Sequence, residues 1–254
     1  MIYKLAKNDF KTKYAGSYLG IIWAFIQPVI TVLVYWFVFE VGFRGGSDSL
    51  PVPFVLYLVA GIIPWFFFQD GLTGGTNSLL EYSYLVKKVV FNISVLPVVK
   101  ILSAVFVHLF FIVFITFLYC CYGHFPDLYY LQLLYYLAGL LLLILGLSYL
   151  TSAVVVFFRD LSQMISIALQ IGIWLTPIMW VAEDKLIHYP LLYKILKLNP
   201  VYYIVMGYRD AFIYKHWFWE RPLWTAYFWC FVIGVLWLGT RVFKKLRVHF
   251  ADVI

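Results

Sequence analysis

The residues that could carry out chemistry in this chain of 254 residues are few, and their spacing matches no catalytic pattern. Nucleotide binding through a phosphate loop needs a glycine-rich run that ends in Gly-Lys-Ser/Thr, because backbone amides and the lysine hold the phosphates. The chain contains no Gly-Lys dipeptide. Its five histidines and three cysteines are scattered and show no metal-ligand spacing. We therefore expect no catalytic residue, no metal site and no cofactor bound by this chain itself.

Charged residues are also missing from the interiors of the apolar runs. Between residues 101 and 158 the only formal charge is Asp127, which falls in a predicted turn. Ion-coupled transporters commonly place ionisable residues at mid-membrane, because a charge there is costly and must serve a pathway. Arg159 and Asp160 fall at a predicted helix junction, where the two can form an ion pair. A transporter built on this chain would take its energy from another subunit.

The composition identifies the surroundings of the chain as lipid. Hydrophobic residues make up 64% of the sequence and charged residues 12%, whereas a soluble domain carries about 25% charged residues. A bilayer core of about 30 Å is crossed by about 20 apolar residues in a helix. We therefore expect an all-α polytopic membrane protein, a single domain over residues 1–254, whose six transmembrane helices are residues 19–41, 54–80, 98–122, 128–158, 161–181 and 223–243.

The basic residues indicate the orientation of these spans. Twelve of the 19 Lys and Arg fall on the side that holds both termini, and the positive-inside rule places that side in the cytoplasm. The net charge of +7 then suits anionic lipid and a cytoplasmic partner, with no role for nucleic acid. Residues 182–222 fall on the periplasmic side and are expected in the membrane interface. Their aromatic cluster from Tyr202 onward is either an interfacial belt or a row of rings that stack on sugars.

Residues 1–18 predict an amphipathic helix that lies flat on the cytoplasmic surface. Asp9 stands four residues before Lys13, which is the spacing of an intrahelical ion pair. The helix is either a positively charged anchor and nothing more, or a surface that contacts the transported molecule. At helical spacing, an apolar stripe runs beside a basic face: Ile2, Leu5 or Ala6, Phe10, Tyr14 and Tyr18 next to Lys4, Lys7 and Lys11.

Residues 81–97 join the second and third predicted spans on the cytoplasmic side. A simple turn needs only a few polar residues, yet this segment mixes basic and apolar side chains. Such a surface is suited to being covered by protein or by lipid headgroups, so we expect a docking role in preference to a plain connecting loop. The residues concerned are Tyr84, Lys87, Lys88, Val89 and Phe91.

Five blocks of residues, in chain order, resemble the membrane subunits of type-2 ABC exporters that move polysaccharides. They are Asp9-Phe10-Lys11 with Lys13-Tyr14, Ser17, Leu19-Gly20, Trp23 and Pro28; then Gly61, Pro64-Trp65 and Phe67; then Lys87-Lys88, Phe91 and Leu96-Pro97; then Arg159-Asp160 and Pro177; and finally Asn199-Pro200 and Tyr208-Arg209.

The resemblance implies a homodimeric permease of the inner (cytoplasmic) membrane. Two copies of the chain would form one channel, and two copies of a cytoplasmic ATP-binding subunit would bind ATP and Mg. The implied substrate is a lipid-linked polysaccharide such as O-antigen on undecaprenyl diphosphate. Teichoic acid, capsule or a small lipophilic compound are alternatives within the class. A polytopic membrane enzyme acting on lipid-linked sugars is the alternative from another class, and it would need a constellation of carboxylates or histidines that the sequence lacks.

The resemblance also suggests roles for particular residues. The basic and apolar residues of segment 81–97 would couple to the ATPase, and the segment 182–222 would form short helices that re-enter the outer leaflet. Lys4, Lys7, Lys11, Tyr14 and Tyr18 would meet the diphosphate headgroup at the channel mouth. A sliding polymer needs sites that release as readily as they capture, which favours a channel lined by aromatic rings. The candidates for this lining are Trp23, Phe25, Trp65 and Phe67.

Overall fold

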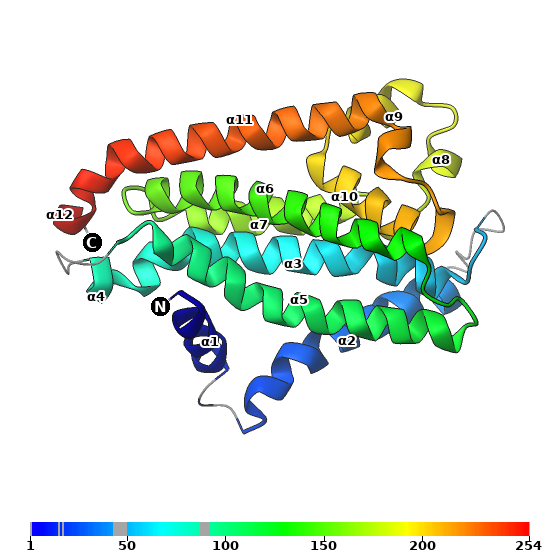
Figure 1. Cartoon of the computed structure of the whole chain (residues 1–254), viewed down its shortest axis with the longest axis horizontal. Helices are drawn as coiled ribbons and strands as arrows, with labels where there is room; N and C mark the ends of the chain where they lie inside the picture. Colours follow the sequence, from blue (N-terminus) through cyan, green and yellow to red (C-terminus); the bar gives the residue numbers. More distant parts are fainter. Residues whose placement is uncertain (1, 15, 17, 43–49, 87–91, 254) are drawn as a thin grey trace.

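The computed structural model describes residues 2–14, 16, 18–42, 50–86 and 92–253. Every regular element in these ranges is helical, as the sequence predicts. The amphipathic helix α1 (Ile2–Lys13) and the last short helix, α12 (Phe250–Val253), lie toward the same end of the molecule, whereas α8 (Ala182–Lys185) and α9 (Pro190–Lys197) lie at the opposite end (Figure 1).

Five helical segments of the described chain are long and apolar enough to cross a membrane, which confirms a multi-pass architecture. They are Gly20–Val41, Phe54–Glu81, Val95–Cys121, Leu128–Val155 and Pro222–His249. Their regular α-helical parts are α2 (Trp23–Trp36), α3 (Phe54–Glu81), α5 (Val95–Cys121), α6 (Gln132–Val155) and α11 (Pro222–Leu246). A short helix, α4 (Ser83–Val86), follows α3.

The predicted span 161–181 is shorter than expected. Helix α7 (Leu161–Leu175) has 15 residues, so it extends about 22 Å at 1.5 Å per residue. Thr176 leaves the helix with an extended backbone (ψ 127°), because the ring of a following proline, Pro177, disfavours the helical conformation of the residue before it. The expected count of six full spans therefore stays a prediction.

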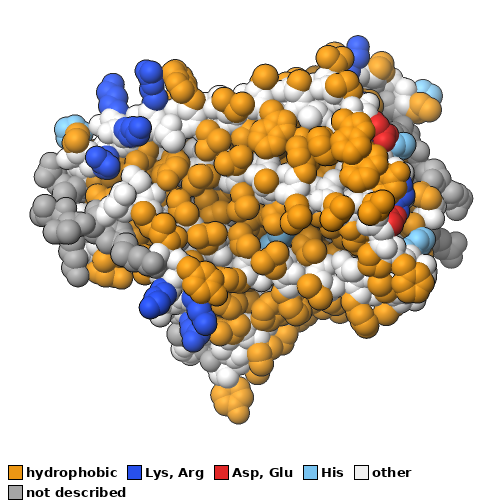
Figure 2. Space-filling view, in the orientation of Figure 1, with side chains coloured by type: hydrophobic (Ala, Val, Ile, Leu, Met, Phe, Trp, Pro, Cys, Tyr) orange, Lys and Arg blue, Asp and Glu red, His pale blue; other side chains and the backbone are white. Residues whose placement is uncertain are grey.

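Helix α3 is the centre of the fold and α2 lies at its edge. Buried residues make up 78% of the most apolar window of α3 but only 6% of that of α2. Helix α3 contacts α2, α5, α6, α7 and α10 (Pro200–Arg209). Hydrophobic side chains also cover much of the outer surface (Figure 2), as contact with lipid requires.

Helices α6 and α11 approach each other backbone to backbone. A Cβ added to Gly239 would lie 2.2 Å from the carbonyl oxygen of Gly146, and one added to Gly146 would lie 2.9 Å from the backbone nitrogen of Leu236. Small residues permit such close packing in membranes, where dispersion contacts replace the hydrophobic effect as the force between helices. This pair therefore fixes α11 against the bundle.

The segment between α7 and α11, whose aromatic content predicts a place at the membrane interface, includes one helix, α10, that is packed in the protein core. Every residue of α10 from Val201 to Arg209 is buried, and the helix packs against α3 and α6. Its aromatic rings fill the protein core because they pack on other aromatic residues, as when Tyr203 stacks on Phe228 with ring centroids 4.5 Å apart. Helix α9 keeps an exposed apolar face, including Leu191 and Ile195.

A fully buried arginine connects this segment to α7 and α3. Arg209 donates from Nη1 to the carbonyl oxygen of Pro177 at 2.7 Å and from Nη2 to that of Ile178 at 2.8 Å. Its guanidinium lies 3.6 Å from the ring centroid of Tyr57. A Cβ added to Gly61 would come within 2.8 Å of Nη2, so the glycine makes room for the arginine. Residues far apart in the sequence thus meet at one buried cation.

The close approach of α6 and α11 predicts a difference between two glycines of the same helix. Gly239→Ala is expected to destabilise the protein by about 1–3 kcal/mol, because the added methyl group pushes two backbones apart. A Cβ added to Gly234 would meet no atom within 4 Å, so Gly234→Ala should leave stability unchanged or raise it slightly. Thermal unfolding in detergent measures both. Equal melting temperatures for the two variants would contradict this packing.

Candidate functional site

A groove of about 670 Å³ opens between α2, α3, α5, α7 and the end of α1. Aromatic rings and uncharged polar groups share its lining. The aromatic residues include Tyr14, Trp23, Tyr35, Phe67 and Trp174, and the uncharged polar residues include Gln27, Thr31, Gln69, Thr73 and Gln170. A surface of flat rings and hydrogen-bonding groups without net charge suits a molecule that has both C–H faces and hydroxyl groups.

The structure brings some of the expected channel aromatics to the groove and uses others in packing. Trp23 and Phe67 line the groove. Phe25 packs on Phe110 of α5, with ring centroids 4.2 Å apart. Trp65 is 2% exposed, and a Cβ on Gly172 of α7 would lie 2.8 Å from its ring, so Trp65 joins α3 to α7.

His108 is a groove residue that the sequence did not single out. It is 2% exposed and stacks on Phe67, with ring centroids 4.6 Å apart. Its Nε2 lies 2.9 Å from the hydroxyl oxygen of Tyr208 in α10, so it connects the groove wall to the buried segment. One feature of the sequence could have identified His108: it is the one histidine inside the apolar run of α5.

The residues predicted on the basic and apolar faces of α1 differ in their exposure. Lys4, Lys7 and Lys11 are exposed. Tyr14 is half-buried and lines the groove, whereas Tyr18 is fully exposed. The buried residues of α1 are Ala6 and Asp9, so a carboxylate stands in the middle of the packed face.

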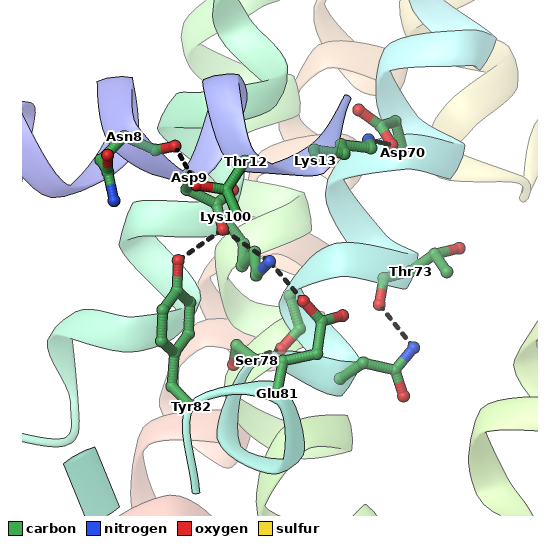
Figure 3. Close-up of polar contacts among 12 residues, drawn as sticks. Asn8, Asp9, Thr12, Lys13, Asp70, Thr73, Ser78, Glu81, Tyr82 and Lys100 are labelled. Carbon is green, nitrogen blue, oxygen red and sulfur yellow. Dashed lines mark hydrogen bonds and ion pairs between the residues drawn. The ribbon is translucent and has the colours of Figure 1, made fainter. Parts of the chain in front are cut away.

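Asp9 is buried because three residues, at the C-terminal end of α3 and near the start of α5, surround it with partners (Figure 3). Lys100 Nζ lies 2.7 Å from Asp9 Oδ1 and 2.5 Å from Glu81 Oε2. The Tyr82 hydroxyl donates to the same Asp9 oxygen at 2.5 Å. Burial, with the hydrogen bond to Asp9, raises the pKa of Tyr82 well above its usual range, so the hydroxyl keeps the proton it donates. We call these four residues the Asp9 cluster.

Lys13, at the end of α1, pairs with Asp70 of α3, and both residues line the groove (Figure 3). This replaces the expected pairing of Asp9 with Lys13 within the helix, because each finds a partner on another helix. Burial lowers the pKa of Lys13 and is the largest single cause, but the charge of Asp70, its hydrogen bond with Lys13 and smaller contributions from Tyr14 and Asp9 together raise the pKa above its usual value. Both side chains are about 40% exposed, so the ion pair is weak and can exchange partners.

Most of the expected coupling residues lie outside the described part of the chain: Lys87, Lys88, Val89 and Phe91. Tyr84, just before them, is 57% exposed. Val86 is buried in a small core with Leu79 and Leu96, so both sides of the segment are fixed to the bundle.

The expected ion pair between Arg159 and Asp160 does not form. Both residues are exposed at the junction between α6 and α7, and none of the ion pairs among the described residues joins them. An exposed pair gains at most about 1 kcal/mol and costs side-chain entropy, so solvent competes with it successfully.

The sequence matches the ABC-2 type transporter family over residues 2–213. The chain therefore belongs to this family, and the resemblance to type-2 ABC transporters is confirmed. It is the membrane domain of such a transporter and not itself an enzyme, and it works with a partner subunit that binds ATP.

Individual relatives cover nearly the whole chain. The chain is 25% identical over 253 residues to the O-antigen export system permease protein RfbA of Klebsiella pneumoniae, with 98% of this chain and 93% of the relative aligned. A protein of the same name from Myxococcus xanthus is 26% identical over 258 residues, with 100% and 95% aligned.

The Asp9 cluster predicts that Lys100 holds α1 in place. Lys100→Met leaves Asp9 buried without its cation, which is expected to cost about 3 kcal/mol and to release α1 to trypsin at its exposed lysines. Lys7→Met, on the exposed face of α1, is the matched control and should match the unmodified protein. Thermal unfolding and cleavage rate are the measurements. If Lys100→Met equals Lys7→Met in both, the cluster does not hold the helix.

Proposed function

We propose that this chain is the channel-forming permease subunit of an ABC exporter that moves a lipid-linked polysaccharide, such as O-antigen on undecaprenyl diphosphate, across the inner membrane. The observation that carries the proposal is the near full-length match to two permeases named for O-antigen export. The groove adds support, because its mixture of rings and uncharged polar groups suits a sugar chain. ATP hydrolysis in a separate subunit, which binds ATP and Mg, drives the transport.

A second copy of the chain completes the channel in this proposal. Helices α2 and α7 both line the groove, and residues on them or directly after α2 are apolar and exposed, among them Leu33, Phe37, Ile167 and Ile171. This apolar surface can pack against another copy of the chain. Two copies that face each other across α2 and α7 would enclose the groove.

The orientation follows from the charges at the ends of the molecule. On the face shown in Figure 2, most Lys and Arg side chains gather toward the end that holds α1 and α12. We assign this end to the cytoplasm. Lys4, Lys7 and Lys11 are exposed there and would meet the diphosphate headgroup, while segment 81–97 at the same end would receive the ATPase. The segment 182–222, at the other end, would re-enter the outer leaflet through α10.

The proposal is tested by charge reversal in segment 81–97. In cells that lack the native chain, Lys87→Glu with Lys88→Glu is expected to abolish copurification of the ATPase, and polymer then accumulates inside the cell. The matched control reverses the charges of Lys244 and Lys245, an exposed pair in the last turn of α11, at the same end of the molecule. This control variant should restore export. Surface polymer and bound ATPase are measured, after membrane insertion is verified.

Two results would contradict the proposal. If cells without the chain display normal amounts of surface polymer, the chain is not the exporter. If the Lys87 and Lys88 variant binds the ATPase fully, segment 81–97 does not couple to it. If the polymer that accumulates inside the cell is teichoic acid or capsule, that polymer replaces O-antigen as the proposed substrate.

A further inference from the structure

Three glutamine side chains face the groove from three different helices. Gln27 lies on α2, Gln69 on α3 and Gln170 on α7, and all three are exposed in the single chain. No hydrogen bond found among the described residues involves their side-chain amides. Gln132, by contrast, is buried and donates to the carbonyl oxygen of His216 at 2.9 Å. The groove therefore concentrates amide groups whose hydrogen-bonding capacity is unused.

Helix contacts place Gln69 and Gln170 at the same level. Helices α3 and α7 run antiparallel, since Asn77 accepts a hydrogen bond from Ser162 and Trp65 lies against Gly172. Gln69 comes eight residues before Asn77, and Gln170 comes eight residues after Ser162, so the two residues lie at the same level along the helices, between these contacts.

Gln27 joins them from the third helix. Tyr35 of α2 contacts Trp174 of α7, with ring centroids 6.4 Å apart, and the two helices run in the same direction. Gln27 comes eight residues before Tyr35, and Gln170 comes four residues before Trp174, so their offset along the helix axes is about one helical turn. All three amides line the same groove, and we call them the polar girdle.

This girdle constrains what can occupy the groove. An amide without a hydrogen-bond partner in hydrocarbon costs several kcal/mol, so lipid chains are excluded as its regular occupant. His108 also needs a hydrogen-bond partner, because its buried Nδ1 has none among the described residues. The occupant must bring many donors and acceptors to a surface without net charge.

We propose that Gln27, Gln69 and Gln170 bind the hydroxyl groups of the sugar units as they pass through the groove, an inference that rests on the proposed function. An amide both donates and accepts, so it pairs with a hydroxyl group in either direction. Because it carries no charge, it releases each unit readily. The rings of Trp23, Tyr35 and Trp174 supply the apolar half of the same site.

The first test measures access to the girdle in the complex with its ATPase. Cys120, Cys121 and Cys230 are replaced by alanine, and cysteine is introduced singly at positions 27, 69 and 170. Ile233→Cys, on α11 outside the groove and 62% exposed, is the control. A water-soluble thiol reagent should modify the three girdle cysteines and not the control. Polymer stalled by blocked ATP hydrolysis should slow that modification several-fold.

Both other outcomes overturn the inference. Girdle cysteines that are never modified would show that a second copy or lipid seals the amides, and modification that is insensitive to polymer would show that only water occupies the girdle.

The second test separates this inference from the proposed function. Leucine at each girdle position should lower the export rate about threefold to tenfold, as expected for a lost hydrogen bond, while Gln163→Leu, exposed at the start of α7 and outside the groove, should not. Export at the unmodified rate by the triple leucine variant would overturn the girdle alone. Absence of any export by the unmodified protein would overturn the proposed function.

Discussion

A polar group in this protein must find its partner inside the protein, because hydrocarbon offers none. Arg209 is the clearest example, because it is a fully buried charged residue. Its buried guanidinium is held by two backbone carbonyl groups past the end of α7 and by the ring of Tyr57. In making these contacts it draws α10 into the core against α3. The packing of α10 against α3 therefore depends on one buried cation.

The same requirement connects the two ends of the proposed mechanism. Asp9 is buried because Lys100 and Tyr82 satisfy it, and this anchors α1 beside segment 81–97. At its other end α1 offers Lys13 to Asp70 at the edge of the groove. One short helix thus extends from segment 81–97 to the groove, with a buried contact at one end and a weak, exchangeable one at the other. The girdle amides have no hydrogen-bond partner among the described residues, which supports the proposal that a polar substrate enters the groove.

The sequence predicts the helical class and most span positions because a run of about 20 apolar residues has few other uses. It misses contacts that depend on packing. Asp9 and Lys13 have intrahelical spacing, yet each pairs with another helix. Trp65 and Trp23 look equivalent as aromatics, but Gly172 leaves room for one ring to be buried while the other faces the groove. Pro177 signals the early end of α7, but the apolar residues that follow it hide that end.

The central claim is that the polymer passes through the groove between α2, α3 and α7. A photo-reactive amino acid at Thr31, which lines the groove, tests it against the same group at Ile233, an exposed residue of α11 outside the groove. In illuminated cells that make the polymer, the account predicts high-mass adducts from Thr31, detected by an antibody to the polymer, and none from Ile233. Adducts from Ile233 alone, or from neither position while export continues, would contradict it.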